Sequence, residues 1–163
     1  MPPRGILLLL ALTGCGSVGG LGPRFEAAWT GSERGRIRAT ATAMWCQDAR
    51  IAQLTATKAD TGVAVLLHPS DSLKAGHYPI VEPAKARASA PASAVALRLL
   101  GSSTVVGYQS ESGTLTLERV ADGRVWGRFE SQAKAASVPA GTITLIGRFS
   151  AIPLAPGGGS CPS

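Results

Sequence analysis

The sequence predicts an all-β fold, either an antiparallel β-sandwich or a small closed barrel of about 8–10 short strands. Apolar and polar residues alternate over most of the chain after residue 23, which is typical of strands with one buried face. Twenty Gly and 11 Pro residues separate these alternating runs. No segment in this region has helical periodicity. A content of 45% hydrophobic and 16% charged residues excludes an intrinsically disordered chain.

Alternation defines the predicted strands in order. The first, 36–45, places Ile37 and Trp45 on one face and Arg36 and Arg38 on the other. The predicted strands span residues 36–45, 49–57, 62–68, 78–81, 95–100, 104–109, 112–120, 124–131 and 141–152. The segment 82–94 is rich in Pro, Ala and Ser, and we interpret it as a long surface loop within one domain.

The sequence Asp122-Gly123 between two alternating runs is a strong hairpin signal. A strict two-residue loop would place Leu117 opposite Arg128. A shift by one residue pairs Leu117 with Phe129 and Glu118 with Arg128, which matches apolar with apolar and opposite charges. We therefore expect a three-residue loop or a bulge.

The tripeptide Gly-Arg-Phe occurs twice in the C-terminal third, at 127–129 and 147–149. Alternation places each Phe on the inward face and each Arg on the outward face. The separation of 20 residues fits two neighbouring strands of a meander rather than a repeat protein.

The N-terminus has the pattern of a secretory signal. A short segment with Arg4 precedes an apolar run over 5–12, and the small residues of Thr13-Gly14-Cys15 follow. The apolar run is too short to span a bilayer, which needs about 18 residues or more.

The sequence Leu12-Thr13-Gly14-Cys15 resembles the lipobox of bacterial lipoproteins. The resemblance implies cleavage before Cys15 and acylation of that residue, with an outer-membrane location favoured because Gly16 follows. It divides the chain into a signal peptide at 1–14, a flexible Gly-rich tether at 15–23 and a single β-domain at 24–163. The mature domain resembles no characterised family.

Acylation of Cys15 would leave Cys46 and Cys161. Two thiols in an exported chain predict one disulfide, and the alternative is two independent buried thiols. Trp45, next to Cys46, is expected in the core, whereas Trp126 is expected on an outer face.

The chain has 16 basic residues, 12 of them Arg, against 10 acidic residues. Alternation places Arg34, Arg36 and Arg38 on one face. If the sheets bring this group together with the arginines of the C-terminal strands, a basic face forms that fits anionic head groups or polyanions. The alternative is a solvated outer face with interleaved Glu. The C-terminal arginines are Arg119, Arg128 and Arg148.

The sequence contains no Gly-x-Ser-x-Gly nucleophile motif and no Walker-type glycine motif. His68, Asp71 and His77 form the only local group of metal-ligand residue types, and two surface histidines at strand ends are the simpler interpretation. We therefore expect no enzymatic activity, no cofactor and no metal.

Three functions remain open at this point. The first is a non-enzymatic, membrane-anchored lipoprotein that acts as a binding or envelope-assembly module. Its partners would be the bilayer, through Cys15, and an envelope protein or anionic lipid, but not nucleic acid. The second is a carrier of a small apolar ligand in a lipocalin-like cup, which requires a cavity of roughly 300 Å³ or more. The third is an exported hydrolase or metal enzyme that uses His68 or His77.

Overall fold

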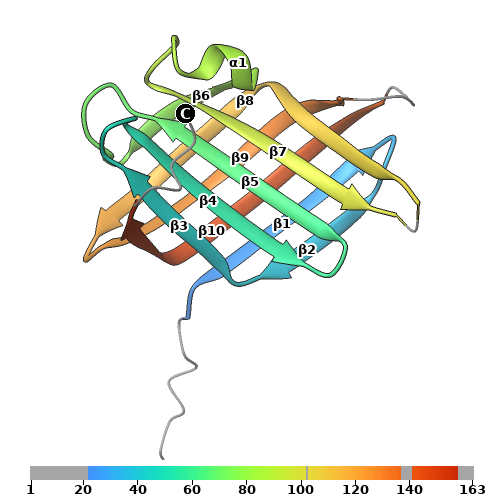
Figure 1. The fold of residues 1–163 in the computed structure, drawn as a ribbon, viewed down its shortest axis with the longest axis horizontal. Coiled ribbons are helices and arrows are strands. Elements are labelled where there is room, and N and C mark those ends of the chain that lie inside the picture. Colours follow the sequence, from blue (N-terminus) through green and yellow to red (C-terminus); the bar gives the residue numbers. More distant parts are fainter. Residues whose placement is uncertain (1–21, 102, 137–140, 158–163) are drawn as a thin grey trace, which may run out of the picture.

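The computed structural model describes residues 22–101, 103–136 and 141–157, which form ten strands and one short helix (Figure 1). The predicted all-β fold is confirmed. The elements are β1 (Arg24–Gly31), β2 (Gly35–Ala39), β3 (Ala41–Cys46), β4 (Ile51–Lys58), β5 (Thr61–His68), β6 (Gly76–Val81), α1 (Pro83–Ala86), β7 (Ala92–Leu100), β8 (Val105–Ala121), β9 (Arg124–Ala135) and β10 (Thr142–Pro156).

The strands form one sheet whose hydrogen bonding closes into a ring. The ring runs β3–β4–β5–β7–β8–β9–β10 and returns to β3, and every pair in it is antiparallel except β10 with β3. Strand β6 pairs with both β7 and β8, while β1 pairs with β10 and carries β2 at its other edge. Figure 1 shows β3, β4, β5 and β7 in the front layer, crossing over β9, β10 and β1 behind them.

The inward side chains of both layers meet in one continuous core. Large apolar residues dominate it, including Leu54, Leu97, Leu115 and Leu145, each at most 1% exposed. Complete burial of a side chain of this size stabilises the folded state by roughly 1.5–3 kcal/mol. Every strand that the structure describes, and the whole of this cluster, lies within residues 24–156.

Several predicted boundaries were wrong. Strand β1 was not predicted. The predicted strand 36–45 is two strands, β2 and β3, separated by a break at Thr40. The break occurs because the two halves pair with different strands: β2 pairs with β1, whereas β3 pairs with β4 and β10. The predicted strands 104–109 and 112–120 form the single strand β8, whose two ends pair with different strands, β7 and β6.

The segment 82–94 is not entirely a loop. It contains the four-residue helix α1, and its last three residues already belong to β7. Pro83 at the first turn is compatible with a helix start, because that position needs no backbone donor. Within the described part of the chain, no helix has the length and hydropathy needed to cross a membrane.

The β8–β9 hairpin has the strict two-residue loop, with Ala121 paired to Arg124. Asp122 and Gly123 both have positive φ, 51° and 64°, as a type I′ turn requires. The expected bulge does occur, between Leu117 and Arg119, but it shifts the register in the other direction, so that Leu117 faces Gly127. The predicted Leu117–Phe129 pair was therefore wrong.

Candidate functional site: an arginine face

The two Gly-Arg-Phe tripeptides are directly paired across β9 and β10. Gly127 lies opposite Phe149, and Phe129 lies opposite Gly147. A Cβ atom at either glycine would overlap the phenyl ring opposite it, so each ring packs over a residue without a side chain. Both rings point into the core, and the two central arginines, Arg128 and Arg148, therefore lie opposite each other on the outer face.

A row of charged side chains crosses the sheet at this level. On β1, Glu26 lies between Arg38 of β2 and Arg148 of β10 in the strand register. Arg148 donates two hydrogen bonds to Oε2 of Glu26, from Nε at 3.2 Å and from Nη2 at 2.8 Å, and Nε of Arg38 lies 3.5 Å from Oε1. At the other end of the row, Arg128 donates to Glu118 of β8 at 3.1 Å. The order of charges across the sheet is thus Arg, Glu, Arg, Arg, Glu.

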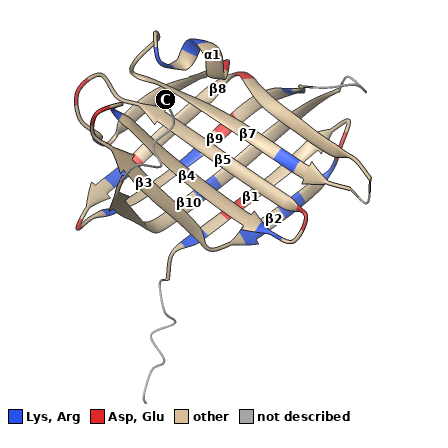
Figure 2. Cartoon of the chain, in the orientation of Figure 1, with Lys and Arg blue, Asp and Glu red and all other residues tan. Residues whose placement is uncertain are grey.

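This row lies in a hollow of about 700 Å³ on the outer surface. Arg24 and Arg36 also line the hollow, as do the apolar side chains of Trp126 and Ile146. Ile146 is 53% exposed, and the guanidinium carbon of Arg119 stacks 4.6 Å from the centre of the Trp126 ring. Figure 2 shows basic residues on β2 and at the start of β1.

We call this surface the arginine face and define it by its charged and exposed apolar members: Arg24, Glu26, Arg36, Arg38, Glu118, Trp126, Arg128, Ile146 and Arg148. Five arginines and two glutamates give it a formal charge of +3.

The electrostatics of the face are dominated by its cations. The hydrogen bond from Arg148 holds the pKa of Glu26 below its usual value. The positive charges of Arg148, Arg38 and Arg24 act in the same direction, and burial opposes them. Arg36 makes no ion pair or side-chain hydrogen bond within the described residues.

The arrangement of these charges contributes little to stability. Arg38, Arg128 and Arg148 have side chains that are 73%, 69% and 74% exposed, and ion pairs of such residues stabilise by only about 0–1 kcal/mol. Two arginines directly opposite each other on neighbouring strands are destabilising. The face therefore presents guanidinium donors to solvent at a cost in stability, which is typical of a binding surface.

Not every predicted basic residue joins this face. Arg36 and Arg38 do, together with Arg128 and Arg148 from the C-terminal strands. Arg34 precedes β2, in the connection from β1, and does not line the hollow. Arg119 lies beside the face, over Trp126.

Two members of the face, Arg24 and Glu26, were missed because β1 was not predicted. Alternation of Phe25, Ala27 and Trp29 was the available signal, and it would have placed Arg24 and Glu26 outward.

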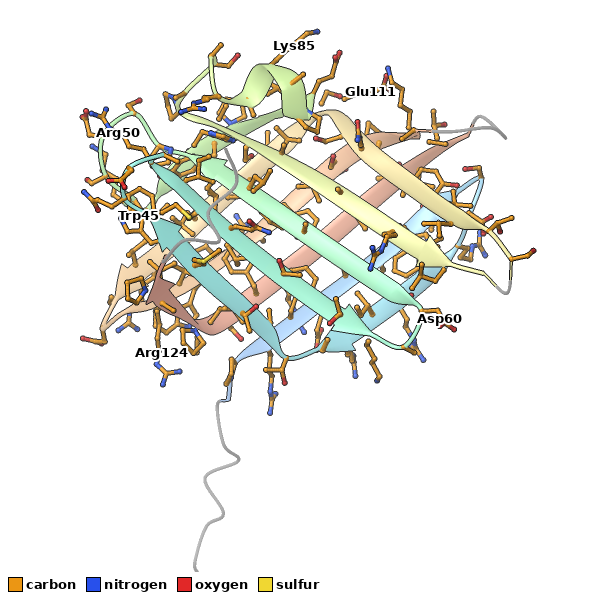
Figure 3. All side chains as sticks on the ribbon, viewed as in Figure 1. Trp45, Arg50, Asp60, Lys85, Glu111 and Arg124 are labelled. Atoms are coloured by element: carbon orange, nitrogen blue, oxygen red, sulfur yellow. The ribbon has the colours of Figure 1, made fainter. Side chains whose placement is uncertain are left out.

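The predicted acylation site, Cys15, and one half of the predicted disulfide, Cys161, lie outside the described residues. Cys46 is 1% exposed at the end of β3. The end of β10 runs parallel to β3 beside it, and the backbone N–H of Gly157 donates to the carbonyl of Trp45 at 2.6 Å. Trp45, labelled in Figure 3, is only partly buried, and its indole nitrogen donates to Gln47.

The two histidines have different environments, one buried and one exposed. His68 is 7% exposed at the end of β5, and burial, with a smaller contribution from the charge of Arg87, lowers its pKa. His77 is exposed on β6, where its Nδ1 lies 3.2 Å from the hydroxyl of Thr116. Among the described residues, no three His, Cys, Asp or Glu side chains are placed to hold a metal ion.

Comparison with known proteins adds no family to this description. No protein-family model matches the chain, and no curated protein or solved structure is significantly similar to it.

Proposed function

We propose that this protein is a non-enzymatic binding module of the cell envelope, held at a membrane by a lipid on Cys15, with the arginine face as its binding surface. The observation that carries the proposal is the face itself. Two consecutive strands from the start of the domain, β1 and β2, and two from its end, β9 and β10, bring five arginines to one hollow, and two of these arginines lie opposite each other.

The chemistry of the face fits anionic ligands. Each guanidinium has five N–H donors in a planar fork that matches phosphate and carboxylate oxygens. Glu26 accepts hydrogen bonds from Arg148 on the side away from Arg128. Glu118 accepts one from Arg128 on the side away from Arg148, so the two glutamates hold the two arginines in place. The remaining donors of the two arginines are available for a ligand between them.

A small apolar ligand fits the structure less well. A lipocalin-like cup would need an apolar cavity inside the ring of strands, where the described residues pack into a continuous core. The hollow of about 700 Å³ opens instead on the outer surface, among charged side chains.

A disulfide between Cys46 and Cys161 is part of the proposal. The hydrogen bond from Gly157 to Trp45 brings the chain next to Cys46 four residues before Cys161. In an exported protein, a bridge of this kind would close a long loop and stabilise the fold by up to roughly 4–5 kcal/mol.

The experiment that tests this proposal is intact-mass analysis of the protein extracted from native membranes with detergent. We expect the mass of residues 15–163 plus acyl chains, and a rise of about two daltons on reduction of one disulfide. A Cys15→Ser variant should lose the acyl mass and the membrane fraction, while a Cys161→Ser variant should keep both and lose the response to reduction. An unlipidated chain in the membrane-free fraction would overturn the anchoring, and a mass unchanged by reduction would overturn the disulfide.

A further inference from the structure

We propose that the arginine face docks onto the phosphate groups of anionic lipids in the same bilayer that holds the anchor, so that the domain lies on the membrane in one orientation. This inference rests on the proposed function, because it takes the lipid on Cys15 as the point of attachment. It goes further by naming the ligand of the face.

The position of the tether is the first argument. Arg24 is both the first residue of β1 and a member of the arginine face, so the chain enters the domain at the edge of this surface. Eight residues, 16–23, separate Arg24 from Cys15. Eight residues span at most about 30 Å when extended, and about 16 Å on average as a flexible Gly-rich chain. The face is therefore never more than a few nanometres from the lipid head groups, at an effective concentration in the millimolar range.

Charge complementarity is the second argument. A formal charge of +3 lies on one side of the molecule, and each basic side chain near an anionic bilayer raises binding by about fivefold. Arg128 and Arg148 lie opposite each other in the strand register, and the guanidinium donors that Glu118 and Glu26 leave unused fit phosphate oxygens, because arginine binds phosphate through paired N–H donors. Arg36, which has no partner within the described residues, offers a further set of donors in the same hollow.

The apolar members of the face are the third argument. Trp126 lines the hollow, and the guanidinium group of Arg119 stacks on its ring. Ile146 lines the same hollow and is more than half exposed. Tryptophan is enriched at membrane interfaces, where its ring lies among the head groups and its N–H stays polar. A purely ionic partner, such as an acidic protein surface, would leave Ile146 without a matching environment.

The experiment uses residues 16–163, which contain all the strands and the core that the structure describes, with circular dichroism to confirm the fold of each variant. Binding is measured by co-sedimentation with vesicles of phosphatidylcholine alone and of phosphatidylcholine mixed with phosphatidylglycerol. We expect binding to the mixed vesicles only, weakening as salt is raised, because screening shortens the range of these interactions.

Two charge-reversal variants locate the contact. Arg128→Glu with Arg148→Glu should weaken binding to the mixed vesicles by at least about tenfold. The matched control, Lys58→Glu with Arg98→Glu, makes the same change of net charge at exposed positions on β4 and β7, outside the face, and should bind within a few-fold of the unchanged protein. Equal losses in both variants would mean that net charge alone drives binding, and would overturn the proposed face.

Tryptophan fluorescence reports the orientation. Brominated lipids in the mixed vesicles should quench the emission, and Trp126→Phe should remove most of that quenching. Absence of binding to the mixed vesicles, or quenching unchanged in Trp126→Phe, would overturn the inference.

The two proposals fail separately. An unlipidated native protein whose domain binds these vesicles through the face would overturn the anchor alone. A lipidated protein whose domain ignores anionic vesicles would overturn the docking alone.

Discussion

The pairing of Arg128 with Arg148 is the least expected feature at the scale of single residues. Alternation alone places both side chains outward, and the sequence therefore predicts that each is exposed. Their direct opposition follows from the register that sets Gly127 against Phe149 and Gly147 against Phe129. Because the two rings can pack only over glycines, the packing of the core fixes the position of the charges on the surface.

Gly147→Ala tests this coupling between core and surface. A methyl group at this position overlaps the ring of Phe129, and we expect the free energy of unfolding to fall by about 1–3 kcal/mol in urea denaturation. Gly107→Ala on β8 is the matched control, since a Cβ atom there meets no atom within 4 Å. The control should match or slightly exceed the stability of the unchanged protein. Equal stability of the two variants would show that the ring does not need the space above Gly147.

The outward arginines could be predicted from the sequence, but their assembly could not. Arg148 contacts Glu26 across a separation of 122 residues, and nothing in the local pattern of either strand specifies that pair. The face forms because β1 pairs with β10. These strands lie at opposite ends of the domain in sequence, so their pairing depends on the packing of the whole molecule.

At the scale of elements, β10 is the strand that organises the fold. Its first part pairs with β1, and after a bulge its last residues pair with β3, while β9 lies along its other edge. Within the bulge Ala151 has φ of 55°, a conformation that residues with a Cβ atom rarely adopt. Arg124, labelled in Figure 3, donates to the Ala151 carbonyl at 3.1 Å and ties β9 to this corner.

Substitutions at Ala151 should report the cost of this corner. Ala151→Val is expected to lower the free energy of unfolding by about 1–3 kcal/mol, because a β-branched side chain opposes positive φ more strongly. Ala151→Gly should keep stability within about 1 kcal/mol of the unchanged protein, since glycine adopts this conformation freely. Thermal or urea unfolding of both variants provides the measurement. A valine variant as stable as the glycine variant would argue against a left-handed residue at this corner.

Elements with strong alternation were predicted best. Strands β4, β5 and β9 lie within a few residues of their predicted bounds, and the Asp122-Gly123 turn lies where its sequence placed it. The predictions failed where a tertiary partner decides the outcome. The register of the β8–β9 hairpin depends on the bulge after Leu117. The break at Thr40 occurs because β2 pairs with β1 and β3 pairs with β4.

At the scale of the whole molecule, the charge state of a few groups links stability to pH. Burial lowers the pKa of His68, and hydrogen bonds from Arg148 and Lys85 lower those of Glu26 and Glu82. For each group the folded state binds its proton less readily than the unfolded state does. All three therefore stabilise the fold at neutral pH, and stability is lost as the pH falls.

The two kinds of group act in separate ranges of pH. The contribution of His68 should begin to decline near its unfolded pKa of 6.5 and fall further as the pH drops through its folded pKa. The contributions of Glu26 and Glu82 should decline only below about pH 4.5.

Urea denaturation at a series of pH values measures this dependence. We expect His68→Asn to flatten the curve in the upper range and leave the lower range unchanged. A His68→Asn variant with the original slope near pH 6 would assign that slope to another group.

Closure of the ring leaves β2 hydrogen-bonded to only one of the described strands, β1. The free backbone groups of such an edge strand are a template on which another copy of the chain can add a strand and begin to aggregate. Arg36 and Arg38 project from this strand, so close approach of a second copy would bring like charges together. The residues proposed to meet lipid phosphates would thus also oppose pairing of two copies through β2, and neutralising them should favour self-association.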